Sequence, residues 1–204
     1  MNIALVEYGA GNLPSVERAL TRLGVESRRA STPEMLASCD ALILPGVGHF
    51  GALMRSLTER SLVKPLRDAV ASGVPLLGIC LGLQAMFAAS DEAIGDAGLG
   101  VFPQNVSALP PTGRLPHMGW NQLRRVRHSV LLEGVPQDAY FYFAHSYAAL
   151  DAGEAAVALC DHSASFVAVL EQENVFATQF HPEKSGPAGA QVLSNFMRRA
   201  GKNR

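Results

Sequence analysis

Short, uninterrupted apolar runs followed by glycine-rich turns constrain the fold of this chain more than any other feature. The runs occupy residues 3–6, 41–44 and 74–79, and the first two lead into turns at 8–12 and 45–48. A strand that is apolar at every position is covered on both faces, as in a parallel sheet. A helical pattern over 13–23 follows the first turn, and mostly helical residues precede the third run. This alternation predicts right-handed crossovers and a parallel sheet over the first ninety residues.

The pattern changes beyond residue 95, where short strand candidates are separated by turn residues. These candidates are residues 101–109, 123–126, 139–143, 155–160, 166–170 and 175–179, with a last helix over 188–199. No repeat, low-complexity tract or linker divides the chain. We therefore expect one domain over residues 1–204, in which both halves share a core.

Composition excludes several classes of protein. The chain has 17 Lys and Arg against 18 Asp and Glu, a formal net charge of -1, so it lacks the basic surplus that nucleic-acid binding requires. With 48% hydrophobic and 17% charged residues, disorder is excluded for most of the chain. No apolar run reaches the roughly 18 to 20 residues of a membrane span. No basic start or cleavable apolar stretch indicates a signal peptide.

Three widely spaced cysteines, Cys39, Cys80 and Cys160, indicate a reducing compartment rather than a disulfide framework. We therefore expect a cytoplasmic protein. Without a C-x-x-C motif a zinc site is not expected, and Cys39 and Cys160 are interpreted as structural.

Cys80 lies in Gly78-Ile79-Cys80-Leu81-Gly82, a thiol version of the nucleophile elbow. At a sharp strand-to-helix turn, the nucleophile projects beyond the edge of the sheet, and flanking glycines remove side chains that would clash. The start of a helix, expected here over 81–89, also favours a thiolate. Free cysteines are more often small buried apolar residues. The two glycines between strand and helix favour the nucleophile.

His181 and Glu183 follow the strand candidate at 175–179. Residues two apart in an extended chain project to the same side, so the carboxylate is expected to take one ring N–H and leave the other nitrogen facing a nucleophile. A lone histidine is more often a hydrogen-bonded core residue, but the adjacent glutamate and the cysteine elbow argue against that interpretation. The pair is a weak candidate for a metal site because the sequence has no other His or Cys cluster that would supply a third ligand.

The turn Pro45-Gly46-Val47-Gly48 ends the second apolar run. Glycines let backbone N–H groups approach a ligand, so this turn and the N–H of Leu81 are candidate donors to an oxyanion. The signal is weak by itself. The turn at Gly9-Ala10-Gly11 completes neither the phosphate-loop nor the dinucleotide motif.

Together these motifs resemble the class I, triad-type glutamine amidotransferases. Pro-Gly-Val-Gly, Gly-Ile-Cys-Leu-Gly-Leu-Gln and His-Pro-Glu stand in the family's order. Tyr-Gly-Ala-Gly-Asn from residue 8, His-Met-Gly-Trp-Asn from 117 and His-Ser-Tyr from 145 further resemble the glutaminase subunits of imidazole glycerol phosphate synthase, over essentially the whole chain. The resemblance implies an α/β fold with a mostly parallel central sheet, flanking helices and additional antiparallel strands in the C-terminal half.

The resemblance also implies roles for individual residues. Cys80 is the nucleophile, His181 the proton carrier and Glu183 its support. The backbone at Val47, Gly48 and Leu81 forms the oxyanion hole. The substrate glutamine is bound by Gly48, Gln84, His145, Ser146 and Tyr147. The partner faces Asn12, Trp120, Asn121, Tyr142 and Lys184.

The implied reaction is hydrolysis of L-glutamine to L-glutamate and ammonia, without cofactor or metal. Ammonia passes to a cyclase partner with a (β/α)8 barrel, which makes imidazole glycerol phosphate and the aminoimidazole carboxamide ribotide in L-histidine biosynthesis. The alternatives are a glutaminase serving anthranilate or pyridoxal phosphate synthesis, against which the Trp120 motif argues, and a non-catalytic regulatory subunit, against which the intact triad argues. His49 departs from the Ala of many relatives without an evident role, Leu83 replaces the commoner Met, and His128 and His162 are expected in exposed loops.

Overall fold

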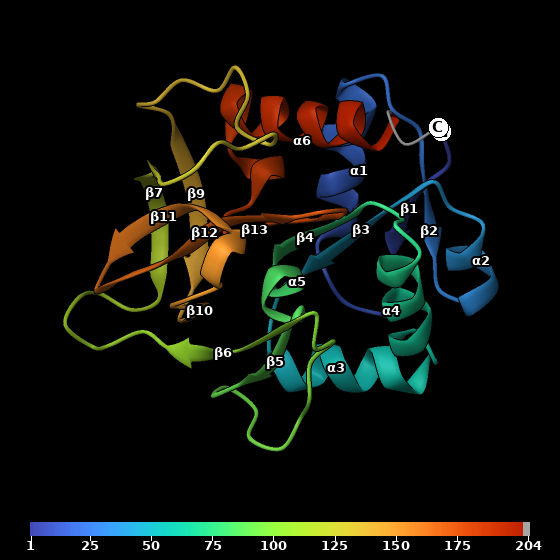
Figure 1. The fold of residues 1–204 in the computed structure, drawn as a ribbon, viewed down its shortest axis with the longest axis horizontal. Helices are drawn as coiled ribbons and strands as arrows, with labels where there is room; N and C mark the ends of the chain where they lie inside the picture. Colours follow the sequence, from blue (N-terminus) through green and yellow to red (C-terminus); the bar gives the residue numbers. More distant parts are fainter. Residues whose placement is uncertain (202–204) are drawn as a thin grey trace.

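The computed structural model describes residues 1–201 and has helices on both faces of a twisted sheet (Figure 1). No helix among these residues is long and apolar enough to cross a bilayer. In chain order the elements are β1 (Ile3–Val6), α1 (Leu13–Arg22), β2 (Ser27–Ala30), α2 (Pro33–Ala37), β3 (Ala41–Gly46), α3 (Phe50–Glu59), α4 (Val63–Ala71), β4 (Leu76–Cys80), α5 (Leu81–Gln84), β5 (Phe87–Ser90), β6 (Phe102–Ala108), β7 (His117–Gln122), β8 (Arg124–Arg125), β9 (Tyr140–His145), β10 (Tyr147–Ala149), η1 (Gly153–Ala155), β11 (Ala156–His162), β12 (Ala164–Gln172), β13 (Val175–Thr178), η2 (Pro182–Lys184) and α6 (Gly186–Gly201).

The central sheet has eight strands in the order β2-β1-β3-β4-β13-β12-β11-β8. The strands from β2 to β13 are parallel, and β12, β11 and β8 continue the sheet antiparallel. The expected mostly parallel sheet with antiparallel strands from the C-terminal half is therefore confirmed. Since β13 pairs with β4, the last strand of the chain lies beside the strand that carries Cys80.

Two apolar clusters cover the two faces of this sheet. Helices α1 and α6 pack on one face, with Leu20 and Phe196 fully buried there. On the other face lie α3 and α4, with buried Phe50 and Leu66, together with the small sheet β10-β6-β5 (Figure 1). Each cluster contains residues of both halves of the chain, and this packing fixes the sheet edge where Cys80 ends β4.

The predicted helix over residues 81–89 is longer than the helix in the structure. Helix α5 ends at Gln84, and residues 87–90 form β5, which pairs with β6 in parallel. The apolar spacing that suggested a longer helix instead reflects full burial, because Met86 and Phe87 have no exposed surface. The ring of Phe87 lies 5.4 Å from that of Phe102 on β6.

Several strands lie outside the expected set. Strands β2, β5, β7 and β10 were not predicted from the sequence. In β7 exposed and less exposed residues alternate, and its pairing with β9 forms a separate two-stranded sheet. His162, expected in an exposed loop, is the last residue of β11 and stacks on His117 with the ring centroids 4.0 Å apart.

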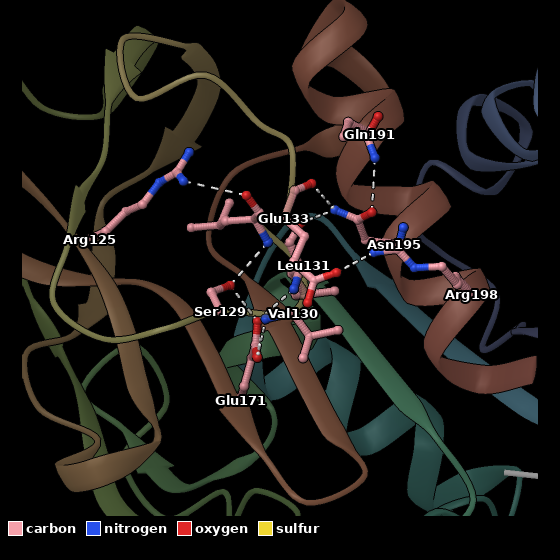
Figure 2. A network of polar contacts seen from close by, with 10 residues as sticks. Arg125, Ser129, Val130, Leu131, Glu133, Glu171, Gln191, Asn195 and Arg198 are labelled. Atoms are coloured by element: carbon pink, nitrogen blue, oxygen red, sulfur yellow. Dashed lines mark hydrogen bonds and ion pairs between the residues drawn. The ribbon is translucent and has the colours of Figure 1, made fainter. Parts of the chain in front are cut away.

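A polar network fixes the segment between β8 and β9. Figure 2 shows the Glu171 carboxylate of β12 beneath a turn that begins at Ser129, and Asn195 of α6 on the other side of that turn. The carboxylate accepts hydrogen bonds from the Ser129 hydroxyl and from the backbone N–H groups of residues 130 and 131. Asn195 is fully buried and donates to the carbonyls of Leu131 and Glu133, at 2.8 and 2.7 Å. Buried polar groups with full sets of partners stabilise a single arrangement, so this network holds the chain entering β9.

Candidate active site

Cys80 is the last residue of β4 and stands in a strained backbone conformation. Its φ is 55° and its ψ is −108°, a backbone conformation that residues other than Gly rarely adopt. Strand and helix approach closely here, since a Cβ added at Gly82 would overlap the carbonyl oxygen of Leu44 and one at Gly78 would press on the backbone of Gly82. The elbow predicted from the glycines is confirmed. Because α5 has only four residues, its dipole contributes little to the electrostatics at this turn.

His181 and Glu183 lie at the end of the neighbouring strand, β13. The Nδ1 of His181 is 2.8 Å from Oε1 of Glu183, and the two side chains are 3% and 1% exposed. The pairing has a different cause from the expected strand alternation. Strand β13 ends at Thr178, His181 caps η2, and Glu183 lies within that turn of 3-10 helix. The other oxygen of Glu183 is buried and has no hydrogen-bond partner among the described residues.

The electrostatics of His181 favour the charged imidazolium. Burial opposes the charge, but hydrogen bonds to Cys80 and Glu183 and the negative charges of both groups outweigh it. The pKa of His181 is therefore raised well above its ordinary value. The contact between His181 and Glu183, together with the electrostatic interaction of His181 with Cys80, gives the thiol, proton carrier and support expected of a triad.

A cavity of about 170 Å³ opens in front of Cys80. All of the residues expected to bind the substrate or to form the oxyanion hole line it, and His181 lines it as well. The complete lining is Val47, Gly48, Cys80, Leu81, Gln84, Glu92, Ala144, His145, Ser146, Tyr147, His181 and Lys184. The structure thus brings together residues that lie far apart in the sequence.

Two glutamine side chains connect the cavity wall to the nucleophile. The Nε2 of Gln84 donates to the carbonyl of Tyr147 at 2.8 Å and to Oε1 of Gln179 at 3.2 Å. The Nε2 of Gln179 in turn donates to the sulfur of Cys80 at 3.7 Å. With both N–H groups of its amide used, Gln84 has only its oxygen to offer to a ligand.

The turn expected to supply oxyanion donors stands at the rim of the cavity. Val47 is 38% exposed, and Gly48 has a φ of 98°, which favours glycine. Behind the turn lies Tyr8, whose buried hydroxyl makes no hydrogen bond of good geometry. Burial raises the pKa of Tyr8 to about 12, and the nearby backbone N–H of Val47 offsets part of this rise.

Glu92 and Gln179 belong to the site but were not predicted from the sequence. Glu92 lines the cavity, and its Oε2 accepts a hydrogen bond from the backbone N–H of Phe50 at 2.7 Å. It lies after β5, beyond the helix that the sequence predicted over 81–89, in a segment to which no role was assigned. Gln179 stands two residues before His181, so the alternation that paired His181 with Glu183 was an available signal for it.

The residues expected to face a partner divide into two groups. Trp120, Tyr142 and Lys184 gather beside His181: the rings of Trp120 and Tyr142 are 5.9 Å apart, and the Lys184 ammonium lies 5.6 Å from the Tyr142 ring. Trp120 is 55% exposed. The second group is Asn12 and Asn121, which are half-buried. The side-chain amide of Asn121 donates a hydrogen bond to the carbonyl of Asp161.

The remaining singled-out side chains have structural contacts. The Nδ1 of His49 accepts a hydrogen bond from the backbone N–H of Gly51 and so caps α3 beside the cavity. Burial raises the pKa of the Cys160 thiol to about 12, which keeps that thiol protonated. The thiol of Cys39 donates to the carbonyl of Met35. Within residues 1–201, no cluster of three His, Cys, Asp or Glu side chains is arranged to hold a metal ion.

Comparison with known proteins agrees with this geometry. The glutamine amidotransferase class-I family matches residues 4–200. The imidazole glycerol phosphate synthase subunit HisH of Methanothermobacter thermautotrophicus is 47% identical over 195 residues, which cover 96% of this chain and 97% of the relative. The subunit HisH of Desulfitobacterium hafniense is 43% identical, with 95% and 92% covered. A solved glutamine amidotransferase structure has a TM-score of 0.78 at 23% identity, with 97% and 98% covered, and is similar in fold. The chain therefore belongs to the class I glutamine amidotransferases, in the family of the HisH subunits of imidazole glycerol phosphate synthase.

Proposed function

We propose that this chain is the glutaminase subunit of imidazole glycerol phosphate synthase. The observation that carries the proposal is the series Cys80, His181 and Glu183: Cys80 and His181 line the same cavity, and the Nδ1 of His181 lies 2.8 Å from the carboxylate of Glu183. The HisH relatives argue against a glutaminase of another pathway. The complete series argues against a non-catalytic subunit.

In the proposed reaction the Cys80 thiolate attacks the side-chain amide carbon of glutamine. The carbonyl oxygen becomes an oxyanion, stabilised by the backbone N–H of Leu81 and by the turn at Val47 and Gly48. His181 gives a proton to the departing nitrogen, and ammonia leaves. His181 then takes a proton from water, which attacks the thioester, and glutamate leaves as Cys80 is regenerated. One glutamine and one water give one glutamate and one ammonia.

The cavity wall supplies complementary groups for the rest of the substrate. Glu92 is the carboxylate that lines it, and we assign to Glu92 the α-ammonium group of glutamine. The backbone of His145, Ser146 and Tyr147 and the turn at Gly48 also line the cavity, and we assign to them the α-carboxylate and the amide of glutamine.

The ammonia passes to a cyclase partner with a (β/α)8 barrel. Ammonia protonates in water near neutral pH and stops being a nucleophile, so a direct transfer requires a docked partner. The exposed ring of Trp120, with Tyr142 and Lys184 beside His181, gives that partner a surface next to the site of ammonia release. Aromatic side chains are enriched at such interfaces.

The test is to replace Cys80 with Ala in the complex with its cyclase. We expect Cys80→Ala to abolish glutamine-dependent synthesis and to leave synthesis from added ammonia intact, because only the ammonia source is lost. Cys39→Ala is the matched control and keeps both activities. Glutamine-dependent turnover that survives in Cys80→Ala would remove the assigned nucleophile.

A further inference from the structure

Two buried histidines face each other across the two-stranded sheet β7-β9, which borders the cavity. His117 on β7 and His145 on β9 are opposite one another in the register, and they are 4% and 7% exposed. The Nδ1 of His117 lies 3.1 Å from the Nε2 of His145. Neither imidazole takes part in the proton transfers assigned to His181.

The acceptors at one end determine where every proton of this pair lies. The Nδ1 of His145 is 3.0 Å from the carbonyl oxygen of Tyr147, and a carbonyl only accepts, so this Nδ1 carries the proton. The Nε2 of a neutral His145 is then an acceptor, and the Nδ1 of His117 must donate to it. The Nε2 of His117 is left as an acceptor, with the side-chain amide of Asn121 3.5 Å away as the longest contact of the series. All donors point the same way, from Asn121 toward Tyr147.

The surroundings keep both rings neutral. Burial lowers the pKa of His117 to about 4 and that of His145 to about 3. The titratable neighbours act in the same direction: His162 stacks on His117, and the charges of His117, His162 and His181 also lower the pKa of His145. The phenyl rings of Phe143 and Phe166 enclose the rest of the pair.

The two ends of the series lie at functionally different places. Asn121 follows the exposed Trp120 on β7, so one end belongs to the strand assigned to the partner surface. The other end is the Tyr147 carbonyl on the cavity wall, which also accepts from Gln84. Gln84 continues through Gln179 to the sulfur of Cys80.

We propose that His117 and His145 are positioning residues, a one-directional hydrogen-bond chain that ties strand β7 to the carbonyl of Tyr147 and so fixes the wall where glutamine binds. This inference rests on the proposed glutaminase function. The rings exchange no proton with substrate. Their fixed donors keep the backbone of residues 145–147 within hydrogen-bonding distance of Gln84. A displacement of β7 is transmitted to that backbone through the two rings.

The first test uses the unmodified full chain. In protein labelled with 15N-histidine, nuclear magnetic resonance separates a ring nitrogen that carries a proton from one that does not. We expect His117 and His145 both to be protonated at Nδ1 alone, and to stay so from pH 5.5 to 8. A proton on Nε2 of either ring, or titration of either ring within that range, would overturn the proposal.

The second test compares two substitutions of His117 in the complex with the cyclase. His117→Leu removes the donor to His145, whereas His117→Asn keeps an N–H near the position of Nδ1. We expect His117→Leu to raise the KM for glutamine roughly 3- to 10-fold, the equivalent of one hydrogen bond. The kcat should change by less than about 2-fold, and His117→Asn should recover most of the KM.

The outcomes separate this inference from the function on which it rests. An unchanged KM in His117→Leu, or an equal rise in both variants, would overturn the positioning role while wild-type activity upholds the glutaminase. A wild-type complex without glutaminase activity would refute the function and leave the tautomer result standing. If His117→Leu fails to fold, the resonance measurement on the wild type still decides.

Discussion

At the scale of single residues, the conformation of Cys80 is the costliest feature of the site. A side chain at a φ of 55° outside the usual regions costs roughly 1–3 kcal/mol, which the surrounding structure must compensate. Leu77, Ile79 and Leu81 are almost completely buried on either side of Cys80, and they anchor both the strand and the helix that the turn joins. The strained residue is the proposed nucleophile itself, so packing energy holds the sulfur toward the cavity.

His181 and Glu183 should differ in how much activity each supports. We expect His181→Ala to be nearly as damaging as Cys80→Ala, because His181 moves the protons of both half-reactions. Glu183→Gln should keep measurable activity, since it removes only the support of the ring. Glutaminase kcat of the complex measures both. A His181→Ala variant with the wild-type rate would exclude His181 from the mechanism.

The raised pKa of His181 makes stability depend on pH. The folded protein holds this proton more tightly than the unfolded chain, so the stabilisation is complete below about pH 6.5 and is lost as the pH rises through the raised folded value. Urea unfolding of wild type and Glu183→Gln between pH 6 and 10 measures this. We expect the stability difference between the two proteins to shrink toward alkaline pH, and a constant difference would contradict the charged state of His181.

Individual residues also show what the sequence could and could not predict. Cys80, His181 and Glu183 stand in local motifs that carry their own chemical meaning. Glu92 does not: it reaches the cavity only because β5 pairs with β6 and turns the following segment toward the start of α3. Likewise, the pairing of His117 with His145 depends on the register of β7 against β9, which no local pattern encodes.

At the scale of elements, strands in the first half were predictable because burial on both faces leaves them uniformly apolar. Strand β2 was not, since Ser27, Arg28 and Arg29 have the composition of a loop, and it is an edge strand paired only with β1. The helix expected to extend beyond Gln84 failed for a related reason. Complete burial makes a short helix followed by a strand look like one longer helix.

The junction between β4 and α5 should tolerate no side chain at Gly82. We expect Gly82→Ala to destabilise the protein by about 3 kcal/mol, because its Cβ would meet the backbone carbonyl of Leu44, which has no room to move. Gly201→Ala, at the open end of α6, is the matched control and should change stability by about 0.5 kcal/mol at most. Urea unfolding checks both, and equal effects would show that the junction is not tightly packed.

At the scale of the whole molecule, the glycine-flanked turn at Val47 predicts control by the partner. We expect the isolated chain to hydrolyse glutamine slowly and the cyclase with its nucleotide ligand to raise the rate about 10² to 10³-fold, the effect of one oxyanion donor. Glycines flank Val47, so its peptide can reorient at little steric cost, and a docked partner needs only a few kcal/mol of preference. Glutaminase kcat should be compared for the chain alone, with apo cyclase, and with cyclase plus ligand. Full activity in the isolated chain would refute the control and leave the triad in place.

The position of β13 has a consequence for how the protein comes into being on the ribosome. Strand β13 inserts between β4 and β12, and it is made after every other strand of the central sheet. Until it arrives, the Cys80 elbow lacks His181, and one edge of β4 lacks a hydrogen-bonding neighbour. The unfinished polypeptide therefore carries an unassisted thiol, and an unpaired strand edge that is prone to aggregation. The same step that completes the sheet also brings His181 and Glu183 to Cys80, so hydrolysis of glutamine begins only after every strand of the central sheet has been made.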